Sequence, residues 1–492
     1  MNRWLVSAAH KSSGKTTVAI GLAAALRARG LAVQPFKKGP DYIDPMWLSL
    51  AAGRACRNLD PHIAGWDETQ AAFRRHAADA DACLVEGNHG LHDGMAGDGS
   101  DSNAALGWRL GLPVILVLDT RGTARGIAPL VLGFQSFDAR LKFAGVVLNR
   151  VGGSRHETKL RQALERYTDV PVLGAIGEDP RLAIAERHLG LVPSNEAAAA
   201  AQLVRALGDA VAQGVDLGRL LEPAGAGRAA AVPASARRPG RSAARSPARA
   251  ATGAAAPACG AARAPVRIAI ARDEAFGFYY ADDLEALEAA GAQLVAFDTL
   301  RDASLPAVDG LFIGGGFPEA LAHRLQANAP LRGRLRELLE AGLPAYAECG
   351  GLMYLARSIT WRGERFEMVG AIPGDALMHD RPVGRGYVHL AQTDDFPWPA
   401  GDGVAERAAG AELRAHEFHH SSVENLAPEL RFAYRVLRGH GVDGAHDGIV
   451  HRNLLASYAH LRGVGAHPWP ARFVAFVREV REQRARAAAL AA

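Results

Sequence analysis

The sequence predicts an α/β protein with two parallel-sheet domains, and three observations lead to this fold class. Short β-rich segments alternate with helical patterns on both sides of a stretch that lacks large apolar side chains. A phosphate-loop pattern follows the first predicted strand, and a Cys-Gly-Gly turn follows a strand in the second half. The 492 residues, 49% of them apolar, can form two or three separate cores.

The stretch between the halves, residues 223–264, consists almost entirely of Ala, Arg, Pro, Ser and Gly. This composition cannot form a hydrophobic core, so we expect a disordered linker there. The linker holds seven arginines and no acid, which leaves 49 basic residues against 52 acidic ones elsewhere. Its arginines therefore account for the net charge of +4, and linker binding to RNA or an acidic partner is the less favoured alternative. The domains are expected at residues 1–222 and 265–492.

The cysteines and the hydropathy of the sequence indicate the cellular compartment that we expect for the protein. The four cysteines lie too far apart for a CxxC pair, and no His/Cys cluster has zinc spacing, so a reduced, cytoplasmic protein is expected. No stretch of about 18 apolar residues occurs, and the apolar start leads straight into the phosphate loop rather than a cleavage site. We expect neither a membrane nor a nucleic acid as a partner, and a homodimer stays open.

The first half predicts a parallel sheet that carries a nucleotide site. Six strands are expected at residues 3–8, 32–37, 82–86, 113–119, 143–149 and 171–176. The phosphate loop follows the first of them and opens a helix near Thr16, which is the context that such a motif requires. Ala9 stands where the pattern GxxxxGK[ST] has glycine, so the loop is a variant, and a chance match is the alternative. The expected ATP-binding residues are Ser12, Ser13, Gly14, Lys15, Thr16 and Thr17.

Within this loop, backbone N–H groups would hold phosphate oxygens, Lys15 would reach the β and γ phosphates, and Thr16 would bind Mg²⁺. Acidic residues follow two other strands at the same sheet edge, where ligands of parallel sheets bind. Asp41, Asp44 and Glu86 are therefore expected Mg²⁺ ligands, although each alone could be a cap or turn residue. Residues expected to contact substrate or phosphate are Lys11, Lys38, Tyr42 and Asp93.

Lysine use supports the same site. The chain has only six lysines against fifty arginines, and four of the six are Lys11, Lys15, Lys37 and Lys38. An arginine-biased sequence that keeps lysine at these positions indicates a need for compact ammonium groups, with chance clustering as the alternative.

The second half predicts another parallel sheet with a cysteine nucleophile. Strands are expected at residues 266–271, 293–297, 310–313 and 344–347, followed by hairpins over 359–392. Cys349 lies between the last of these strands and a helix expected at 352–357, which is the geometry of a nucleophile elbow. A thiol at a helix N-terminus is activated for attack on an amide, while a buried structural cysteine is the alternative. The expected oxyanion donors are the backbone N–H groups of Gly315, Gly316 and Gly350.

The cysteine needs a histidine base, and spacing alone does not select it. The late part of the chain offers His416, His419, His420, His440, His446, His451 and His460. The segment His416-Glu417-Phe418-His419 also has metal-like spacing, although a metal site is the less favoured reading of it.

Ten ordered blocks resemble the cobyrinic acid a,c-diamide synthase family, including its hydrogenobyrinic acid relatives. They cover nearly the whole chain outside the linker and include FKKGPDYIDP, VEGNHGLHDG, GVVLNRVGG, ERHLGLVPSNE, AYAECGGLMYL and LASYAHLRG. The resemblance implies an N-terminal P-loop domain similar to dethiobiotin synthetase and a C-terminal class I-like glutamine amidotransferase domain. It also implies that Asn149 contacts adenine and that His460 is the partner of Cys349. Class I amidotransferases commonly have Glu two residues after this histidine, but position 462 is Arg, so we expect a Cys349/His460 dyad.

The resemblance implies ATP- and glutamine-dependent amidation of the a and c acetates of a corrin, with Mg²⁺ as cofactor. ATP would phosphorylate the carboxylate, and ammonia from glutamine would displace the phosphate. Three alternatives stay open. The first is cobyric acid synthase, which shares the domain plan. The second is amidation of a nickel tetrapyrrole, such as nickel sirohydrochlorin, as by a relative in the same family. The third is a partitioning-type ATPase, which shares the phosphate loop but has no use for Cys349.

Overall fold

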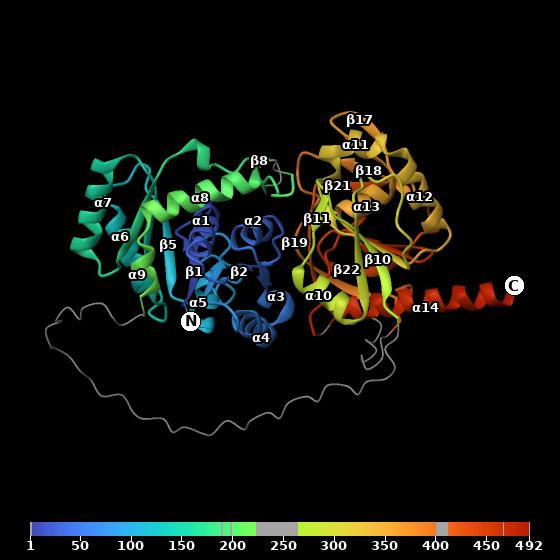
Figure 1. Cartoon of the computed structure of the whole chain (residues 1–492), viewed down its shortest axis with the longest axis horizontal. Coiled ribbons are helices and arrows are strands. Elements are labelled where there is room, and N and C mark those ends of the chain that lie inside the picture. The colour runs from blue at the N-terminus through green and yellow to red at the C-terminus, as the bar shows by residue number, and fades with distance from the viewer. Residues whose placement is uncertain are drawn as a thin grey trace, which may run out of the picture.

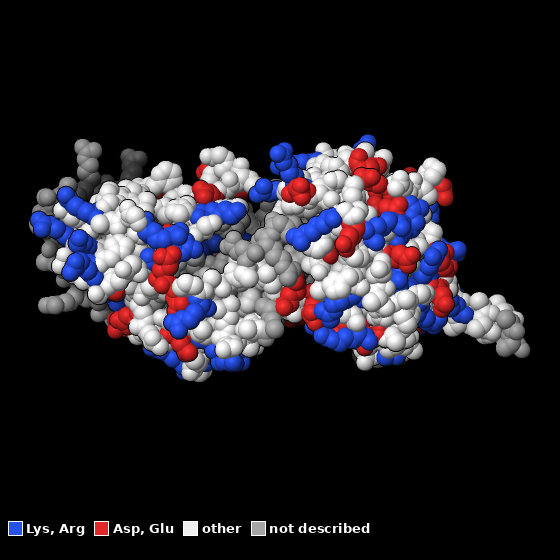
Figure 2. Space-filling view, turned by 90° about the horizontal axis from the view of Figure 1, so that it is seen from above, with Lys and Arg blue, Asp and Glu red and all other residues white. Residues whose placement is uncertain are grey.

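The computed structural model describes residues 2–187, 190–196, 199–222, 264–399, 412–465 and 467–491. Figure 1 shows two α/β halves side by side, one before and one after the predicted linker, which lies outside the described residues except for Ala264. Within the described ranges, no helix is both long and apolar enough to cross a membrane. On the face shown in Figure 2, basic and acidic side chains of the described residues are interspersed over both halves.

The first half contains a seven-stranded sheet, all parallel, in the order β3-β2-β4-β1-β5-β6-β7. The six predicted strands are confirmed to within two residues, and the sequence prediction omits only the three-residue edge strand β3. The strands are β1 (Asn2–Ala8), β2 (Val33–Lys38), β3 (Arg57–Leu59), β4 (Ala82–Glu86), β5 (Val114–Asp119), β6 (Phe143–Val151) and β7 (Val172–Gly177).

Helices cover both faces of this sheet, and each face has its own hydrophobic core. One core lies under α1 and α8, which pack closely because Gly21 has no side chain: a Cβ there would lie 2.7 Å from the carbonyl oxygen of Leu207. The helices are α1 (Lys15–Ala28), α2 (Ile43–Ala52), α3 (Pro61–Ala64), α4 (Trp66–Ala77), α5 (Asn103–Leu110), α6 (Ile127–Phe137), α7 (Ser154–Tyr167), α8 (Ala200–Gly214) and α9 (Leu217–Leu221). Smaller elements are the 3-10 turn Pro180–Leu182 and the strand pair β8 (Glu186–Arg187) and β9 (Gly190–Leu191).

The second half contains a nine-stranded mixed sheet in the order β12-β10-β13-β15-β24-β23-β22-β19-β20. The strands are parallel from β12 to β24 and antiparallel beyond it. The four predicted parallel strands are confirmed to within one residue, but the strands after residue 392 were not predicted. The strands of this sheet are β10 (Val266–Ala271), β12 (Ala292–Phe297), β13 (Gly310–Ile313), β15 (Ala345–Glu348), β19 (Gly384–Gln392), β20 (Glu412–His419), β22 (Arg431–Arg438), β23 (His446–His451) and β24 (Leu454–Ser457).

A four-stranded sheet and several helices complete this half. The sheet comprises β16 (Ala356–Trp361), β17 (Glu364–Glu367), β18 (Ile372–Met378) and β21 (Ser421–Glu424), and a two-stranded pair joins β11 (Phe276–Phe278) to β14 (Gly315–Gly316). The helices are α10 (Ala281–Ala289), the 3-10 turn Pro318–Leu321, α11 (Ala322–Ala327), α12 (Ala329–Glu340), α13 (Gly350–Leu355) and α14 (Trp469–Ala491). The helix predicted at 352–357 is wrong in its last residues. The chain leaves α13 at Leu355 because the alternating segment Ala356–Trp361 pairs with β17 and β18.

The two halves make direct polar contacts. Arg57 of β3 pairs with Asp282 of α10 at 3.0 Å, and the Tyr387 hydroxyl of β19 lies 3.1 Å from the Asp60 carboxylate. In Figure 1, α2 and α3 face β11, α10 and β19 across this contact. The loop after β2 and the start of α2, which carry the predicted metal ligands Asp41 and Asp44, therefore face the half that carries Cys349.

Candidate active site

The phosphate loop has the backbone conformation that its function requires. Ser12 (φ 65°) and Gly14 (φ 84°) are left-handed, and α1 begins at Lys15. The Asn149 side chain donates from Nδ2 to the carbonyl oxygen of Ser13 at 2.9 Å. A Cβ on Gly14 would lie only 2.1 Å from this Nδ2, so glycine is required there. Asn149 thus stabilises the phosphate loop through this hydrogen bond. Its contact with adenine remains a prediction.

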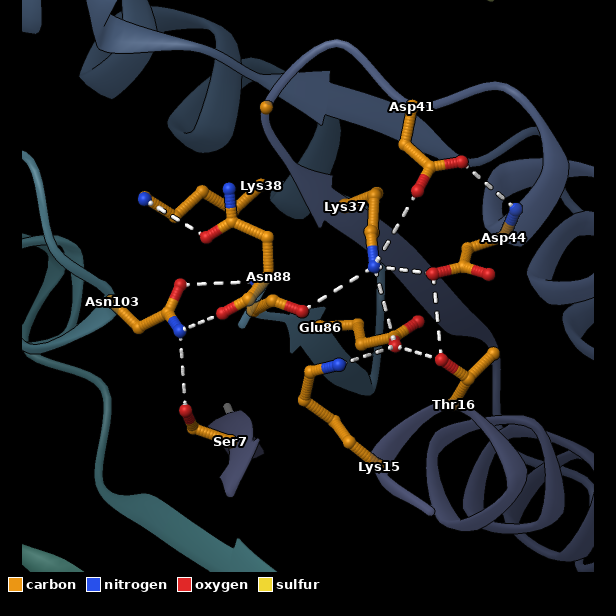
Figure 3. A network of polar contacts seen from close by, with 12 residues as sticks. Ser7, Lys15, Thr16, Lys37, Lys38, Asp41, Asp44, Glu86, Asn88 and Asn103 are labelled. Carbon is orange, nitrogen blue, oxygen red and sulfur yellow. Dashed lines mark hydrogen bonds and ion pairs between the residues drawn. The ribbon is translucent and has the colours of Figure 1, made fainter. Parts of the chain in front are cut away.

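The predicted carboxylates gather around one buried lysine (Figure 3). Lys37 Nζ lies 2.5 Å from Asp44 Oδ2, 3.3 Å from Glu86 Oε1 and 3.9 Å from Asp41 Oδ2. Lys15 Nζ lies 3.5 Å from Glu86 Oε1, and the Thr16 hydroxyl donates to the same oxygen at 2.6 Å. We call these six residues the Lys37 cluster. Three separate chain segments meet in it because β1, β2 and β4 are neighbours and end at one sheet edge.

Electrostatics keeps Lys37 charged although its side chain is only 2% exposed. Burial alone would lower the pKa of Lys37, but the nearby carboxylates of Asp44, Glu86 and Asp41 outweigh burial and raise it above its ordinary value. Burial likewise opposes ionisation of Asp44, but the charges of Lys37 and Lys15 dominate and lower its pKa. The cluster is therefore an array of fixed charges at the phosphate loop.

The oxygen atoms of the Lys37 cluster fit a divalent cation. Thr16 Oγ1 lies within hydrogen-bond distance of both Glu86 (2.6 Å) and Asp44 (3.4 Å), so three hard oxygen donors converge. Glu86 Oε2 is buried and has no hydrogen-bond partner among the described residues. Asp41 is farther out, with its side chain 36% exposed, and it accepts a hydrogen bond from the Asp44 amide at 3.1 Å.

The other residues predicted to contact substrate or phosphate lie outside the Lys37 cluster and have their own contacts. Lys38 Nζ donates to Asn88 Oδ1 at 3.1 Å, and Asp93 accepts from the Gly90 amide at 2.9 Å. Tyr42 is 8% exposed and packs against the second half. Lys11 is exposed beside Ser12, and Thr17 lies in the first turn of α1.

Two residues of this region escaped the sequence prediction. Asn103, at the start of α5, donates from Nδ2 to the carbonyl oxygens of Asn88 and Gly90 and accepts from the Asn88 amide, so it fixes the loop after β4. Nothing in the local sequence marks it. Lys37 stood out only through the scarcity of lysine, which gave it no specific role.

The second half confirms a strained turn at Cys349. This residue follows β15 directly and has φ 50° and ψ −103°, a conformation that non-glycine residues rarely adopt. A Cβ on Gly351 would lie 2.3 Å from the carbonyl oxygen of Ile313, so α13 packs tightly against β13. Such a turn presents the thiol at the N-terminus of a helix, as a nucleophile elbow does. Reactivity at this position stays a prediction.

His460 is brought to Cys349, and Glu348 supplies a third member. His460 Nδ1 lies 3.2 Å from Glu348 Oε2, and Glu348 Oε1 accepts from the Leu461 amide (3.0 Å) and the Tyr346 hydroxyl (2.6 Å). Burial alone would lower the pKa of His460, but its hydrogen bonds to Cys349 and Glu348 raise it above its ordinary value. The sequence predicts a Cys349/His460 dyad, whereas the structure has the arrangement of a triad.

The glycines predicted as oxyanion donors lie beside this group. A Cβ on Gly315 would lie 2.7 Å from His460 Cε1, and one on Gly350 would lie 2.9 Å from the carbonyl oxygen of Gly316. Their backbones therefore crowd around the thiol and the imidazole, a position suited to binding a tetrahedral oxyanion. Donation by any of the three stays a prediction.

The His416–Glu417–Phe418–His419 segment forms part of β20 and has structural contacts. Glu417 is 1% exposed and accepts from the amides of His440 and Gly441, both at 2.8 Å. The His419 ring stacks on Tyr458 at 3.7 Å between centroids. Among the described residues, the one group of three His, Cys, Asp or Glu side chains close enough to share a metal ion is His76, Asp282 and Glu285, and Arg57 forms ion pairs with both of its acids.

Comparisons with known proteins give the family. Residues 5–192 match the CobQ/CobB/MinD/ParA nucleotide binding domain, and residues 267–464 match the CobB/CobQ-like glutamine amidotransferase domain. The cobyrinate a,c-diamide synthase of Magnetococcus marinus is 47% identical over 97% of this chain and 97% of its own. That of Methanosarcina acetivorans is 38% identical over 94% and 92%. The solved structure of PurLQS from Thermotoga maritima, with 15% identity and a TM-score of 0.33, covers 44% of this chain and 99% of its own and adds no functional information.

The two matched domains coincide with the two halves described above, and the relatives are similar over nearly their whole length. The P-loop parallel sheet and the amidotransferase half expected from the sequence are both confirmed. The chain belongs to the cobyrinate a,c-diamide synthase family.

Proposed function

We propose that the Lys37 cluster and the Cys349 site perform the two half-reactions of one amidation. As a member of its family, the protein is a glutamine-dependent amidoligase of cobalamin biosynthesis that uses ATP and glutamine. Its substrates are then the a and c acetate carboxylates of cobyrinate or hydrogenobyrinate. The assignment rests on one observation: a phosphate loop with a charged cluster faces a cysteine, histidine and glutamate site within the same chain.

At the ligase site, a corrin carboxylate oxygen attacks the γ-phosphorus of ATP, and ADP leaves. Lys15 and the phosphate-loop amides stabilise the charge of the phosphates during transfer. Thr16, Asp44 and Glu86 would hold Mg²⁺, with Asp41 reaching it through water, and this ion supplies charge neutralisation when bound. Lys37 holds Asp44 and Glu86 in place, because its ammonium lies between them.

At the glutaminase site, Cys349 Sγ attacks the carboxamide carbon of glutamine. His460 takes the thiol proton and delivers it to the leaving ammonia, while Glu348 orients the imidazole through Nδ1. Water then hydrolyses the thioester to glutamate. The ammonia attacks the acyl phosphate at the ligase site and displaces inorganic phosphate, so two amidations consume two ATP and two glutamines.

The test separates the two half-reactions. Cys349→Ser should abolish glutamine-dependent amidation of cobyrinate but leave ATP-dependent amidation intact when a high concentration of ammonia is supplied. The ligase site needs only the product of the thiol, so ammonia replaces it. A folded Cys349→Ser protein that ammonia does not rescue would contradict the two-site scheme.

The macrocycle is the finer part of the proposal. ATP-dependent amidation of cobyrinate, hydrogenobyrinate and nickel sirohydrochlorin, measured side by side, distinguishes the corrin assignment from the nickel tetrapyrrole alternative. We also place the reaction in the cytoplasm, in keeping with three unpaired cysteines among the described residues, Cys56, Cys83 and Cys349.

A further inference from the structure

One side chain of the ligase half lies directly against the glutaminase histidine. Tyr42 follows β2 and lies between Asp41 of the loop and Asp44 in the first turn of α2, and only 8% of its surface is exposed. Its ring lies 4.9 Å from the His460 ring between centroids, at an interplanar angle of 45°. The imidazole is therefore bounded by Glu348 on one side and by an aromatic ring from the other domain.

The second half provides a rigid platform for this ring. Tyr42 stacks on Phe278 with centroids 5.5 Å apart and contacts Tyr280 at 4.5 Å. The Arg462 guanidinium lies over the Tyr280 ring, 4.2 Å from its centroid. Arg462 is 5% exposed and pairs with Asp282 at 3.5 Å. Aromatic contacts thus hold Tyr42, and one of the rings that it contacts is itself held by a buried, ion-paired arginine.

The backbone that carries Tyr42 is held equally firmly on the ligase side. Asp44 is fixed by Lys37, and the Asp44 amide donates to Asp41, so the tyrosine lies between two residues of the Lys37 cluster, Asp41 just before it and Asp44 two residues after it. Helix α2 begins at the next residue, Ile43. Any displacement of this loop must therefore move a ring that packs on His460.

Resting on the function proposed above, we propose that Tyr42 is a positioning residue for the glutaminase, which holds the His460 imidazole in register with Cys349 from the opposite domain. The glutaminase site is then completed only when the ligase half is docked. A general base must stay within hydrogen-bond reach of its nucleophile, and a small misplacement of it lowers the rate strongly. Glu348 fixes one ring nitrogen, and Tyr42 limits tilting of the ring about that contact.

The test measures glutamine hydrolysis by the full chain without ATP or corrin. Tyr42→Ala removes the ring and should lower kcat by about tenfold or more, with KM for glutamine within about threefold. Tyr42→Phe keeps the ring and should stay within about twofold of the wild type. Arg57→Ala is the matched control, because Arg57 crosses the same interface through Asp282 and Glu285 and has no described contact with His460.

A second readout reports on the thiol and the imidazole themselves. The rate of Cys349 alkylation by iodoacetamide, followed by mass spectrometry of its peptide, is measured against pH for the same four proteins. The ionisable groups that face His460 are Glu348 and Cys349, with His416 beside it. Without Tyr42, water reaches the imidazole and weakens these interactions, so alkylation should become slower and its pH profile should change in Tyr42→Ala alone.

Three results would overturn the proposal: an unchanged kcat and alkylation profile in Tyr42→Ala, an equal loss in Arg57→Ala, or faster alkylation in Tyr42→Ala, which would make the ring a cover for the thiol. Glutamine-dependent amidation by the wild type is measured on the same preparation. If it proceeds while Tyr42→Ala behaves as the wild type does, the positioning role fails and the proposed function stands.

Discussion

Glu348→Gln tests the third member of the glutaminase site. In the native protein, Glu348 Oε2 faces His460 Nδ1, while Oε1 accepts from the Leu461 amide and the Tyr346 hydroxyl. In the variant, the two donors at Oε1 require the amide oxygen there, which turns the amide NH₂ toward His460. The imidazole must then accept at Nδ1 and carry its proton on Nε2, so the nitrogen that should take the thiol proton is already protonated.

The expected loss follows from this tautomer change. Enforcing the wrong tautomer removes general-base catalysis, which is worth about 10²–10⁴ in rate. We expect kcat for glutamine hydrolysis to fall by about a hundredfold or more, or at least ~2.7 kcal/mol in the activation barrier. The pKa of His460 should also fall toward its ordinary value, since the Glu348 charge and hydrogen bond help to raise it.

The assay is glutamine hydrolysis together with ammonia-dependent amidation by the same protein. Ammonia-dependent amidation should stay near the wild-type rate, because Glu348 makes no described contact with the Lys37 cluster. Glu417→Gln is the control, since Glu417 is a similarly buried carboxylate that accepts from the amides of His440 and Gly441 and makes no described contact with His460 itself. If Glu348→Gln hydrolyses glutamine within threefold of the wild type, or if Glu417→Gln loses as much at equal Tm, Glu348 does not orient His460.

Three further predictions concern the ligase half and the linker. Asp41→Asn should lower ammonia-dependent amidation about a hundredfold. Its Tm should stay almost unchanged, since Asp41 is partly exposed. Glu86→Gln should lower both activity and Tm, because it leaves the buried Lys37 ammonium with less compensating negative charge. Near-normal amidation by Asp41→Asn at saturating Mg²⁺ would remove it from the site. Burial lowers the pKa of Lys38 to about 8, against the opposing charges of Asp101 and Asp60, so KM for the corrin polycarboxylate should rise above that pH as the ammonium is lost. This rise should disappear in Lys38→Arg, and an identical pH profile in that variant would exclude the role. Replacing the seven linker arginines by serine should keep turnover within about twofold, and a large loss would reveal a binding partner for them.

Most of the parallel strands were predictable because they are short apolar runs bounded by turn residues, and several of them, such as β1 and β4, are buried along most of their length. β4 and β10 match their predicted bounds without any shift. β3 was missed because Arg57–Leu59 is a short edge strand with only one apolar residue, and its pairing depends on β2. The end of α13 was misplaced because local helix propensity at Ala356 and Arg357 gives way to pairing with β17 and β18.

The nucleophile and the phosphate loop could be read from the sequence because their chemistry depends on residues adjacent in the chain. Lys37 could not be assigned a role in this way, since its importance comes from carboxylates on β4 and α2 that only the sheet order brings together. Its burial against them requires the tertiary structure, and composition alone indicated only that lysine was favoured there.

The same reasoning explains why Glu348 escaped notice although it precedes the predicted nucleophile. The acid that class I amidotransferases commonly have two residues after their histidine, here His460, is replaced by Arg462. β15 and β24 are parallel neighbours with Glu348 opposite Ser457, so the end of β15 lies beside the segment that leads to His460. A carboxylate at the end of β15 can therefore reach the imidazole as well as one following it could. Position 462 is then free for a different task, and its arginine braces the aromatic contacts that join the glutaminase to the ligase half.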